Sequence, residues 1–410
     1  MAFKTIKIRM IVCCFLLFVL TACSNEGQAN VGKASFEHDG NTIRIGILLS
    51  TTGSTAVVER SMLNAAYLAF DEINKAGGID GKRIEYIQED YCSDPTIAAA
   101  KIQDLIVNEN VVATVGCCTS ASRKATLPVL KKYNSLLVYP TFTEGEETDP
   151  NVIYTGAMPN QQAVEYIPWL MKKCGKKVFL IGNDYVFPVI CNKQAKRIIE
   201  MNNGTVLGEK YVSIGYSDFT DILETIKKVR PDFIYCDLVG DSVISFYKEY
   251  KRLGLDPEKC PIAAIATDEM SVQGMGADCA EGHYASMNYF STLDTPASQE
   301  FVKKYEEHSQ DGSVITSSAE ATYDSCYLLA KAIEKVQNPY DTNSLIKAFS
   351  GLEFDAPQGK IKVDETNHCT WLYSRFAIAH NGKFQIVYQS KNAIKPEPWP
   401  TILYPDGSHN

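Results

Sequence analysis

Short apolar runs alternate with segments of helical spacing along most of the chain. The apolar runs of the first part predict strands at residues 42–49, 82–90, 111–115, 136–139 and 152–155. Apolar positions at helical spacing predict helices between them, at residues 62–75, 96–108 and 121–132. This alternation of strands and helices predicts a parallel, doubly wound α/β sheet with right-handed crossovers.

The same rhythm starts again in the middle of the chain. It predicts helices at 162–172, 189–201, 219–229 and 241–253, and strands at 177–181, 205–211, 233–237 and 262–266. The last part predicts a strand at 283–290, helices at 298–310, 319–335 and 344–349, and β segments at 359–363, 373–380 and 383–389. Two consecutive units, in a chain of 410 residues, predict two similar lobes.

The first residues differ from the rest. Lys4, Lys7 and Arg9 precede an apolar run at 11–20, which is too short to span a bilayer and is typical of a secretory signal. The run ends in Leu-Thr-Ala-Cys, which resembles the bacterial lipobox. We therefore expect a signal peptide at 1–22, a lipid on Cys23 and a lipid-anchored tether at 23–41. The alternative is an ordinary signal with a chance cysteine at the cleavage site.

Composition limits the possible partners and cofactors. The net charge is −9 and the charges alternate in sign along the chain, so no basic face for nucleic acid is expected. Ten cysteines remain after Cys13 and Cys14 leave with the signal and Cys23 is lipidated. Their spacing fits no zinc motif, and we expect mostly buried free thiols, with pairing left open. No metal and no cofactor are predicted.

Residues 116–125, GCCTSASRKA, form a predicted strand-loop-helix junction. Such a junction offers free backbone N–H groups, the Ser120 hydroxyl and the positive end of a helix dipole. Open α/β sheets bind ligands at this edge. The alternative is that Ser120 only caps its helix.

Several segments together match a known family. They are AFDEINKAGGIDGKRIE at 69–85, GCCTSASRKATLPV at 116–129, LLVYPTFTEGEE at 136–147, IYTGAMPNQQ at 153–162, FLIGNDYVFP at 179–188, LDTPAS at 293–298 and FDAPQGKI at 354–361. With these segments the chain resembles the type I periplasmic binding fold. Within that fold it is most similar to the urea- and short-amide-binding lipoproteins of ABC importers, in the branched-chain amino acid receptor superfamily.

The resemblance implies two Rossmann-like lobes with a ligand between them and a hinge of three crossings, near 158–161, 283–289 and 356–359. Lobe 1 would comprise 42–158 and 290–356, lobe 2 would comprise 159–289 and 360–395, and 396–410 would be a tail. The implied function is capture of urea or a short-chain amide outside the cytoplasm and its delivery to permease and ATPase subunits. A lipid anchor would hold the protein to the membrane.

A buried site for urea must satisfy one carbonyl and several N–H groups, and it needs apolar walls that exclude water. The positions carried over from the family are Cys118, Ser120, Tyr139, Thr141, Tyr185, Phe187, Asp241 and Glu269. Alternatives stay open for three of them: Tyr139 packed inside its sheet, Asp241 capping a helix, and Glu269 on the surface. Cys118 departs from the aromatic residue common in relatives, which leaves room for a slightly larger amide. Arg123 and Lys124 are expected to face solvent or the lobe surface.

Other functions are weighed against this one. A branched-chain amino acid receptor and an amide-sensing regulatory or chemoreceptor protein share the fold. An enzyme would need Cys117 or Cys118 as an activated thiolate with a base in reach. No histidine falls at a predicted strand-to-helix junction, and no serine-nucleophile or metal motif is present, so we expect no enzymatic activity.

Overall fold

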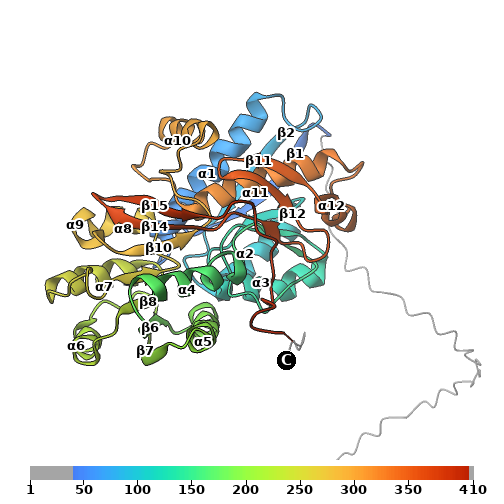
Figure 1. The fold of residues 1–410 in the computed structure, drawn as a ribbon. Helices are drawn as coiled ribbons and strands as arrows, with labels where there is room; N and C mark the ends of the chain where they lie inside the picture. Colours follow the sequence, from blue (N-terminus) through green and yellow to red (C-terminus); the bar gives the residue numbers. More distant parts are fainter. Residues whose placement is uncertain (1–39, 406–410) are drawn as a thin grey trace, which may run out of the picture. The chain divides into compact units, whose positions relative to one another are not determined.

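The computed structural model describes residues 40–405 (Figure 1). The predicted signal peptide, the lipidation site Cys23 and the tether up to residue 39 lie outside the described residues. Two sheets organise the described part, and each is a continuous run of parallel strands, one of them with an antiparallel edge.

The first sheet has five strands in the order β2-β1-β3-β4-β5, and all neighbours pair in parallel. The strands are β1 (Thr42–Leu48), β2 (Arg83–Glu89), β3 (Thr114–Gly116), β4 (Leu137–Tyr139) and β5 (Val152–Tyr154). The helices between them are α1 (Ala56–Lys75), α2 (Pro95–Val107) and α3 (Ser120–Tyr133). The predicted strands and helices of this half are confirmed, except that α1 begins earlier than expected and β3 begins and ends later than the predicted 111–115.

The second sheet has seven strands in the order β15-β14-β10-β9-β8-β6-β7. Its parallel strands are β6 (Lys177–Asn183), β7 (Thr205–Val212), β8 (Phe233–Asp237), β9 (Ile262–Ala264) and β10 (Tyr284–Met287). The strands β14 (Arg375–His380) and β15 (Lys383–Gln389) add an antiparallel edge. The chain enters this sheet through the short helix η1 (Pro159–Gln161). Its helices are α4 (Ala163–Lys173), α5 (Val186–Met201), α6 (Thr220–Val229), α7 (Asp241–Arg252), α8 (Glu269–Met275) and α9 (Ala277–Ala280).

The remaining elements pack with the first sheet. They are α10 (Pro296–His308), α11 (Ser317–Glu334), α12 (Thr342–Phe349) and the small antiparallel sheet of β11 (Glu353–Ala356), β12 (Gly359–Val363) and β13 (Thr370–Trp371). Helix α11 lies beside α1, as Figure 1 shows. We call lobe 1 the five-stranded sheet with α1–α3 and α10–α12, and lobe 2 the seven-stranded sheet with α4–α9.

The third crossing between the lobes differs from the prediction, which placed it near 356–359 and started the second part of lobe 2 at 360. Ala356 pairs with Gly359 across a tight hairpin turn, and Ile361, Val363 and Leu372 lie in the buried core of lobe 1. The chain therefore returns to lobe 2 only between β13 and β14. The glycine turn resembles a crossing in sequence because a hairpin and a linker use the same turn residues.

The predicted tail at 396–410 is packed on the protein as far as Tyr404. The Glu146 N–H donates to the Pro398 carbonyl at 2.8 Å, and Leu403 is buried in a core cluster of lobe 2.

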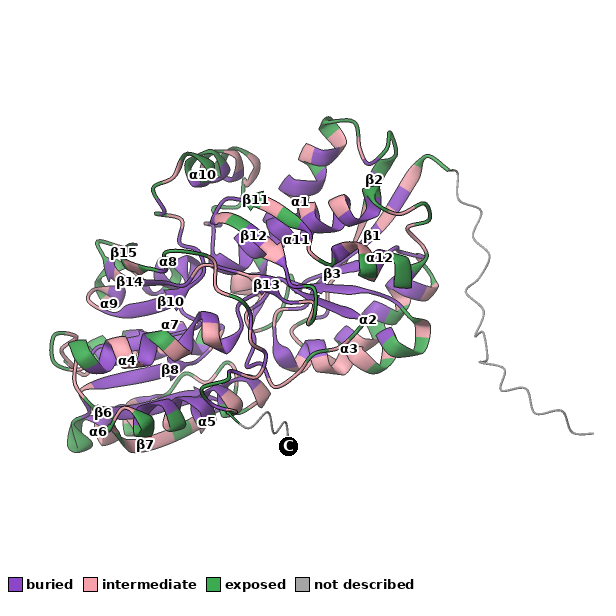
Figure 2. Ribbon diagram, turned by 45° about the vertical axis from the view of Figure 1, so that its right-hand side comes forward, coloured by how far each residue is buried: buried purple, intermediate pink, exposed green. Residues whose placement is uncertain are grey.

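Burial follows the layers of the fold. The strands β3, β8 and β10 are buried at every residue, as Figure 2 shows in purple. Strands covered on both faces are continuous apolar runs rather than alternating ones, which is the pattern that predicted them. The carboxyl ends of β3, β4, β6, β8 and β9 lead into loops that meet at one cavity between the lobes.

Candidate ligand-binding site

A small cavity lies between the two lobes, and its volume is about 30 Å³. A single water needs roughly 10–15 Å³ of such space, so only a very small molecule fits this cavity. Lobe 1 contributes Thr55, Val58, Cys118, Thr119, Ser120, Thr141, Phe142, Ser317 and Ser318 to its wall. Lobe 2 contributes Tyr185, Phe187, Val239, Gly240, Ala266, Asp268 and Met287.

The junction after β3 forms part of the lobe 1 wall. Gly116 has φ +145°, and a Cβ there would lie 2.2 Å from the Leu48 carbonyl oxygen, so the close approach of β1 and β3 requires glycine. Thr119 caps α3, since its hydroxyl accepts the Ser122 N–H at 3.1 Å. The cap is therefore Thr119, and the alternative that Ser120 caps the helix is wrong.

Two helices of lobe 1 begin at the cavity wall. Ser120 is the first residue of α3, and Ser317 and Ser318 open α11 after the cap residue Thr316. The first N–H groups of a helix have no partner inside the helix and carry partial positive charge, so this wall favours a carbonyl oxygen of a ligand. Ser317 and Ser318 were not among the predicted site residues, because nothing near them in sequence marks them as part of the junction at 116–125.

The Ser120 hydroxyl is already bonded within lobe 1. It donates to Glu144 Oε2 at 2.5 Å and accepts from Arg123 Nη1 at 3.1 Å. Arg123 is fully buried, bonds Glu144 and Glu147, and lies 4.8 Å from the centre of the Tyr139 ring. The expectation that Arg123 faces solvent is wrong, because two carboxylates and an aromatic face compensate its burial.

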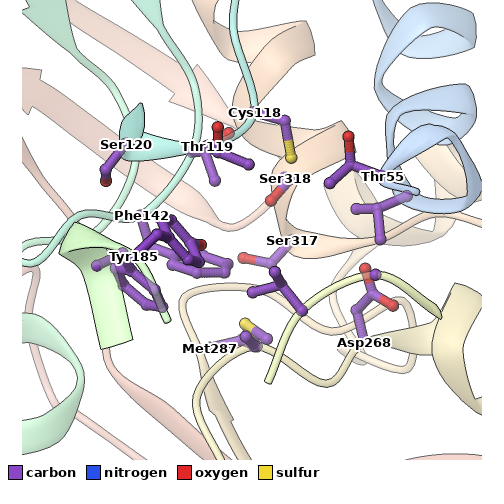
Figure 3. A pocket seen from close by; sticks show the side chains of 16 residues that line it. Thr55, Cys118, Thr119, Ser120, Phe142, Tyr185, Asp268, Met287, Ser317 and Ser318 are labelled. Carbon is purple, nitrogen blue, oxygen red and sulfur yellow. The ribbon is translucent and has the colours of Figure 1, made fainter. Parts of the chain in front are cut away.

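Aromatic side chains close the cavity from both lobes. Phe142 of lobe 1 and Phe187 of lobe 2 have ring centres 5.4 Å apart, and Tyr185 lies 6.3 Å from Phe187. Figure 3 shows Tyr185 and Phe142 on one side of the cavity and Asp268 on another. Tyr139 does not line it: its hydroxyl donates to the Cys118 carbonyl at 2.9 Å from within the sheet, as the packed alternative predicted.

Asp268 is the carboxylate of the cavity. Its Oδ1 accepts from the Ser271 N–H at 2.9 Å and the Ser271 hydroxyl at 2.8 Å, which caps α8. Its second carboxyl oxygen, Oδ2, takes no part in this cap, and burial raises the pKa of the side chain. Such an oxygen is ready to accept an N–H from a ligand.

The two predicted carboxylates lie elsewhere. Asp241 is exposed at the start of α7, outside the cavity, with its N–H donating to the Ser54 carbonyl at 3.3 Å. Glu269 is buried, not on the surface, but it lines a different cavity. Asp268 could have been chosen from the sequence if the short helix α8 had been predicted, because aspartate is a favoured residue at the N-cap of a helix.

The remaining predicted residues, Cys118 and Thr141, line the cavity with Ser120, Tyr185 and Phe187. Burial raises the pKa of the Cys118 thiol well above its usual value and raises that of Cys117 to about 12, so neither is a thiolate at neutral pH. No histidine of the part of the chain that the structure describes lines the cavity. Within the described range no cluster of ligating side chains suited to a metal ion is found.

A model of the periplasmic binding protein domain matches residues 43–405. The chain belongs to this family. A leucine-, isoleucine-, valine-, threonine- and alanine-binding protein of Pseudomonas aeruginosa is 24% identical over 342 residues, which are 82% of this chain and 90% of the relative. The family places this binding protein outside the cytoplasm, and no helix within residues 40–405 is long and apolar enough to cross a membrane.

Solved structures share the fold. A solute-binding protein of an ABC transporter from Rhodopseudomonas palustris, in complex with 3,4-dihydroxybenzoic acid, has a TM-score of 0.79 at 23% identity and covers 87% of this chain and 98% of its own. A branched-chain amino acid transporter substrate-binding protein from Streptococcus pneumoniae, in complex with isoleucine, has a TM-score of 0.75 at 24% identity. The match covers 87% of this chain and 100% of that structure's chain. The predicted fold class, two α/β lobes of the type I periplasmic binding fold, is confirmed.

Proposed function

We propose that this binding protein captures urea or another short-chain amide between its lobes and delivers it to the permease and ATPase of an importer. The observation that carries the proposal is the cavity itself. Its volume of about 30 Å³ suits urea, formamide or acetamide, whereas leucine and benzoate are considerably larger.

The polar groups of the wall match an amide. The helix starts of lobe 1 offer N–H donors for the carbonyl, and Asp268 of lobe 2 offers a carboxylate oxygen for the amide N–H groups. Among residues 40–405, no lysine, arginine or histidine lines the cavity, so an aromatic acid would find no side-chain cation to compensate its negative charge.

The mechanism is closure of the lobes on the ligand. An amide that touches both the lobe 1 helix starts and Asp268 binds the closed state better than the open one, and so it shifts the population toward closure. Lipid anchoring at Cys23 remains part of the proposal, and intact-mass measurement of the membrane-extracted protein would test it.

The first experiment is calorimetric titration of the protein from residue 24 onward with urea, acetamide, formamide, leucine and benzoate. We expect binding of one or more amides and none of the two acids. Asp268→Asn keeps a capping residue for α8 but removes the charge, and we expect it to weaken amide binding by about 10- to 100-fold, since charge-assisted hydrogen bonds contribute roughly 1.5–3 kcal/mol.

Asp241→Asn is the matched control, because Asp241 opens a neighbouring helix of the same lobe but does not line the cavity. Its affinity should equal that of the wild type. Leucine binding without amide binding would replace the proposal by a branched-chain amino acid receptor. Equal amide affinity in Asp268→Asn and wild type would remove the assignment of Asp268.

A further inference from the structure

The end of the chain runs between the lobes after the last strand, β15. We call residues 395–404 the C-terminal segment, and in Figure 1 the dark red end of the chain runs down past α3 toward α5. Asn160 of η1, where the chain first passes from lobe 1 to lobe 2, fixes the start of this segment. Its Nδ2 donates to the Lys395 carbonyl at 2.7 Å, and its Oδ1 accepts the Glu397 N–H at 2.8 Å.

The loop between β4 and β5 of lobe 1 is shaped to touch the C-terminal segment. The Glu146 N–H donates to the Pro398 carbonyl at 2.8 Å, and a Cβ at Gly145 would lie 2.3 Å from the same carbonyl oxygen. Glu146 itself has φ +53°, a left-handed conformation that a residue other than glycine adopts only when its surroundings hold it there. The contact therefore depends on a specific backbone geometry on the lobe 1 side.

The Glu146 side chain meets donors from the C-terminal segment and from lobe 2. Its Oε1 accepts from the Tyr404 hydroxyl and from Gln194 Nε2, the latter at 3.3 Å. Lys193 Nζ lies 3.7 Å from the same oxygen. Gln194 and Lys193 belong to α5, so a single carboxylate of lobe 1 joins lobe 2 and the end of the chain.

Leu403 anchors the C-terminal segment in lobe 2. Its side chain is 1% exposed and belongs to the buried cluster of lobe 2 that includes Phe187. The N–H groups of Leu403 and Tyr404 both donate to the Pro400 carbonyl, at 2.8 and 2.9 Å, which makes a compact turn. Since neighbouring Cα atoms are only about 3.8 Å apart, Tyr404 cannot follow Glu146 far while Leu403 stays buried in lobe 2.

The contact lies beside the ligand cavity. The loop that carries Glu146 also carries Thr141 and Phe142 of the cavity wall. On the lobe 2 side, Gln194 Nε2 also donates to the Glu144 carbonyl at 2.9 Å. Parting the lobes at this contact would therefore open the cavity between them.

We propose that the C-terminal segment is a strap that holds the two lobes together, so that the lobes part only when Tyr404 releases Glu146 or Leu403 leaves the core of lobe 2. Because the segment contacts both lobes outside the cavity, it shifts the equilibrium toward joined lobes before any ligand binds. The proposal does not rest on which ligand the cavity takes.

The test measures how fast N-ethylmaleimide modifies individual cysteines of the amide-free protein, by mass spectrometry of the digested peptides. Cys118 lines the cavity, whose volume of about 30 Å³ holds only about two waters, so the reagent reaches it when the lobes part. Its rate of modification then follows the population of parted lobes. Cys326 in the core of lobe 1 reports unfolding, and the exposed Cys92 reports the reagent itself.

Tyr404→Phe removes only the hydroxyl that bonds Glu146. A hydrogen bond to a charged group changes an equilibrium by about tenfold, so we expect Cys118 to react about tenfold faster, with Cys92 and Cys326 unchanged. Tyr388→Phe is the matched control, because the Tyr388 hydroxyl donates to Glu165 Oε2 at 2.7 Å within lobe 2. It should leave all three rates as in the wild type.

A chain that ends at Lys395 loses the whole strap, and its Cys118 should react faster still. If this shortened chain does not fold, Tyr404→Phe decides alone. An unchanged Cys118 rate in the variants, or the same increase in Tyr388→Phe, would overturn the proposal. So would a parallel increase at Cys326, which would mean that the segment stabilises the fold as a whole. No amide is added, so a failure here is distinct from a failure of the proposed function.

Discussion

Gly240 of lobe 2 lies against the loop before α1 in lobe 1, and a single methyl group can break this contact. Gly240 follows β8, has φ +60°, and lines the small cavity. A Cβ at this position would lie 2.4 Å from the Ser54 carbonyl oxygen. The same oxygen accepts the Asp241 N–H at 3.3 Å. We therefore predict that Gly240→Ala keeps the lobes from closing fully.

The size of the effect follows from the geometry. The Cβ would stand about 1 Å inside the 3.4 Å at which ordinary contact begins, and its neighbour is backbone, which cannot rotate away. The lobes must separate by a similar distance, which costs the hydrogen bond from Asp241, about 0.5–1.5 kcal/mol, together with close packing around it. A loss of about 1–2 kcal/mol from closure lowers the apparent ligand affinity by about 5- to 30-fold.

The assay is titration calorimetry with urea or whichever small amide the wild type binds, together with small-angle scattering of the saturated protein. Alanine at positive φ also costs conformational energy, so the control must share that cost. Gly254→Ala is suitable, because Gly254 follows the other end of α7, has φ +69°, and would place its Cβ in open space. Equal affinity and equal compaction in Gly240→Ala and Gly254→Ala would refute the reasoning.

Two further predictions concern stability. His283 is buried, its Nδ1 accepts the Ile262 N–H at 3.0 Å, and burial lowers its pKa from 6.5 to about 3, so between these pH values only the unfolded chain takes up the proton. The stability contributed by neutral His283 is fully present above pH 6.5 and falls by about 1.4 kcal/mol for each pH unit below it. Between about pH 7 and about pH 5, the free energy of unfolding measured with urea should therefore fall by about 2 kcal/mol more in the wild type than in His283→Gln. Equal losses in the two proteins would contradict this. Arg123→Met leaves Glu144 and Glu147 without their buried partner and should lower the free energy of unfolding by about 3–5 kcal/mol. The control is Arg60→Met at an exposed position, which should lower it by less than about 0.5 kcal/mol. Similar melting temperatures for the two variants would show that the buried ion pairs contribute little.

The fold could be predicted because its signal is local and repeated. The run at 111–115 that leads into β3 and the strand β8 are mostly apolar, and amphipathic helices separate such runs, so each strand-helix unit can be recognised within about 30 residues. The third crossing could not be placed in the same way. Whether the turn at Gly359 is a hairpin or a linker depends on where β12 packs, which is a long-range property.

The site was predicted where one segment defines it and missed where segments distant in sequence meet. Cys118, Ser120 and Thr141 lie on junctions that follow strands of one sheet, and all three line the cavity. Ser317 and Ser318 reach it only because α11 packs on α1, which no local pattern reveals. The choice of Glu269 over Asp268 failed by one position, because a helix of seven residues is too short to show its register before its cap is known.

The strand order has a consequence for how the protein acquires its structure. The core of lobe 1 includes residues from Ile43 to Leu372, and the sheet of lobe 2 is completed by Lys383–Gln389. An N-terminal fragment therefore lacks part of each core and cannot complete either one. If the chain is threaded across a membrane from its N-terminus, almost all of it must arrive before either lobe can become native. This delay in folding keeps the chain unfolded while it crosses the membrane. Both lobes can then complete their cores only after the last segment has emerged.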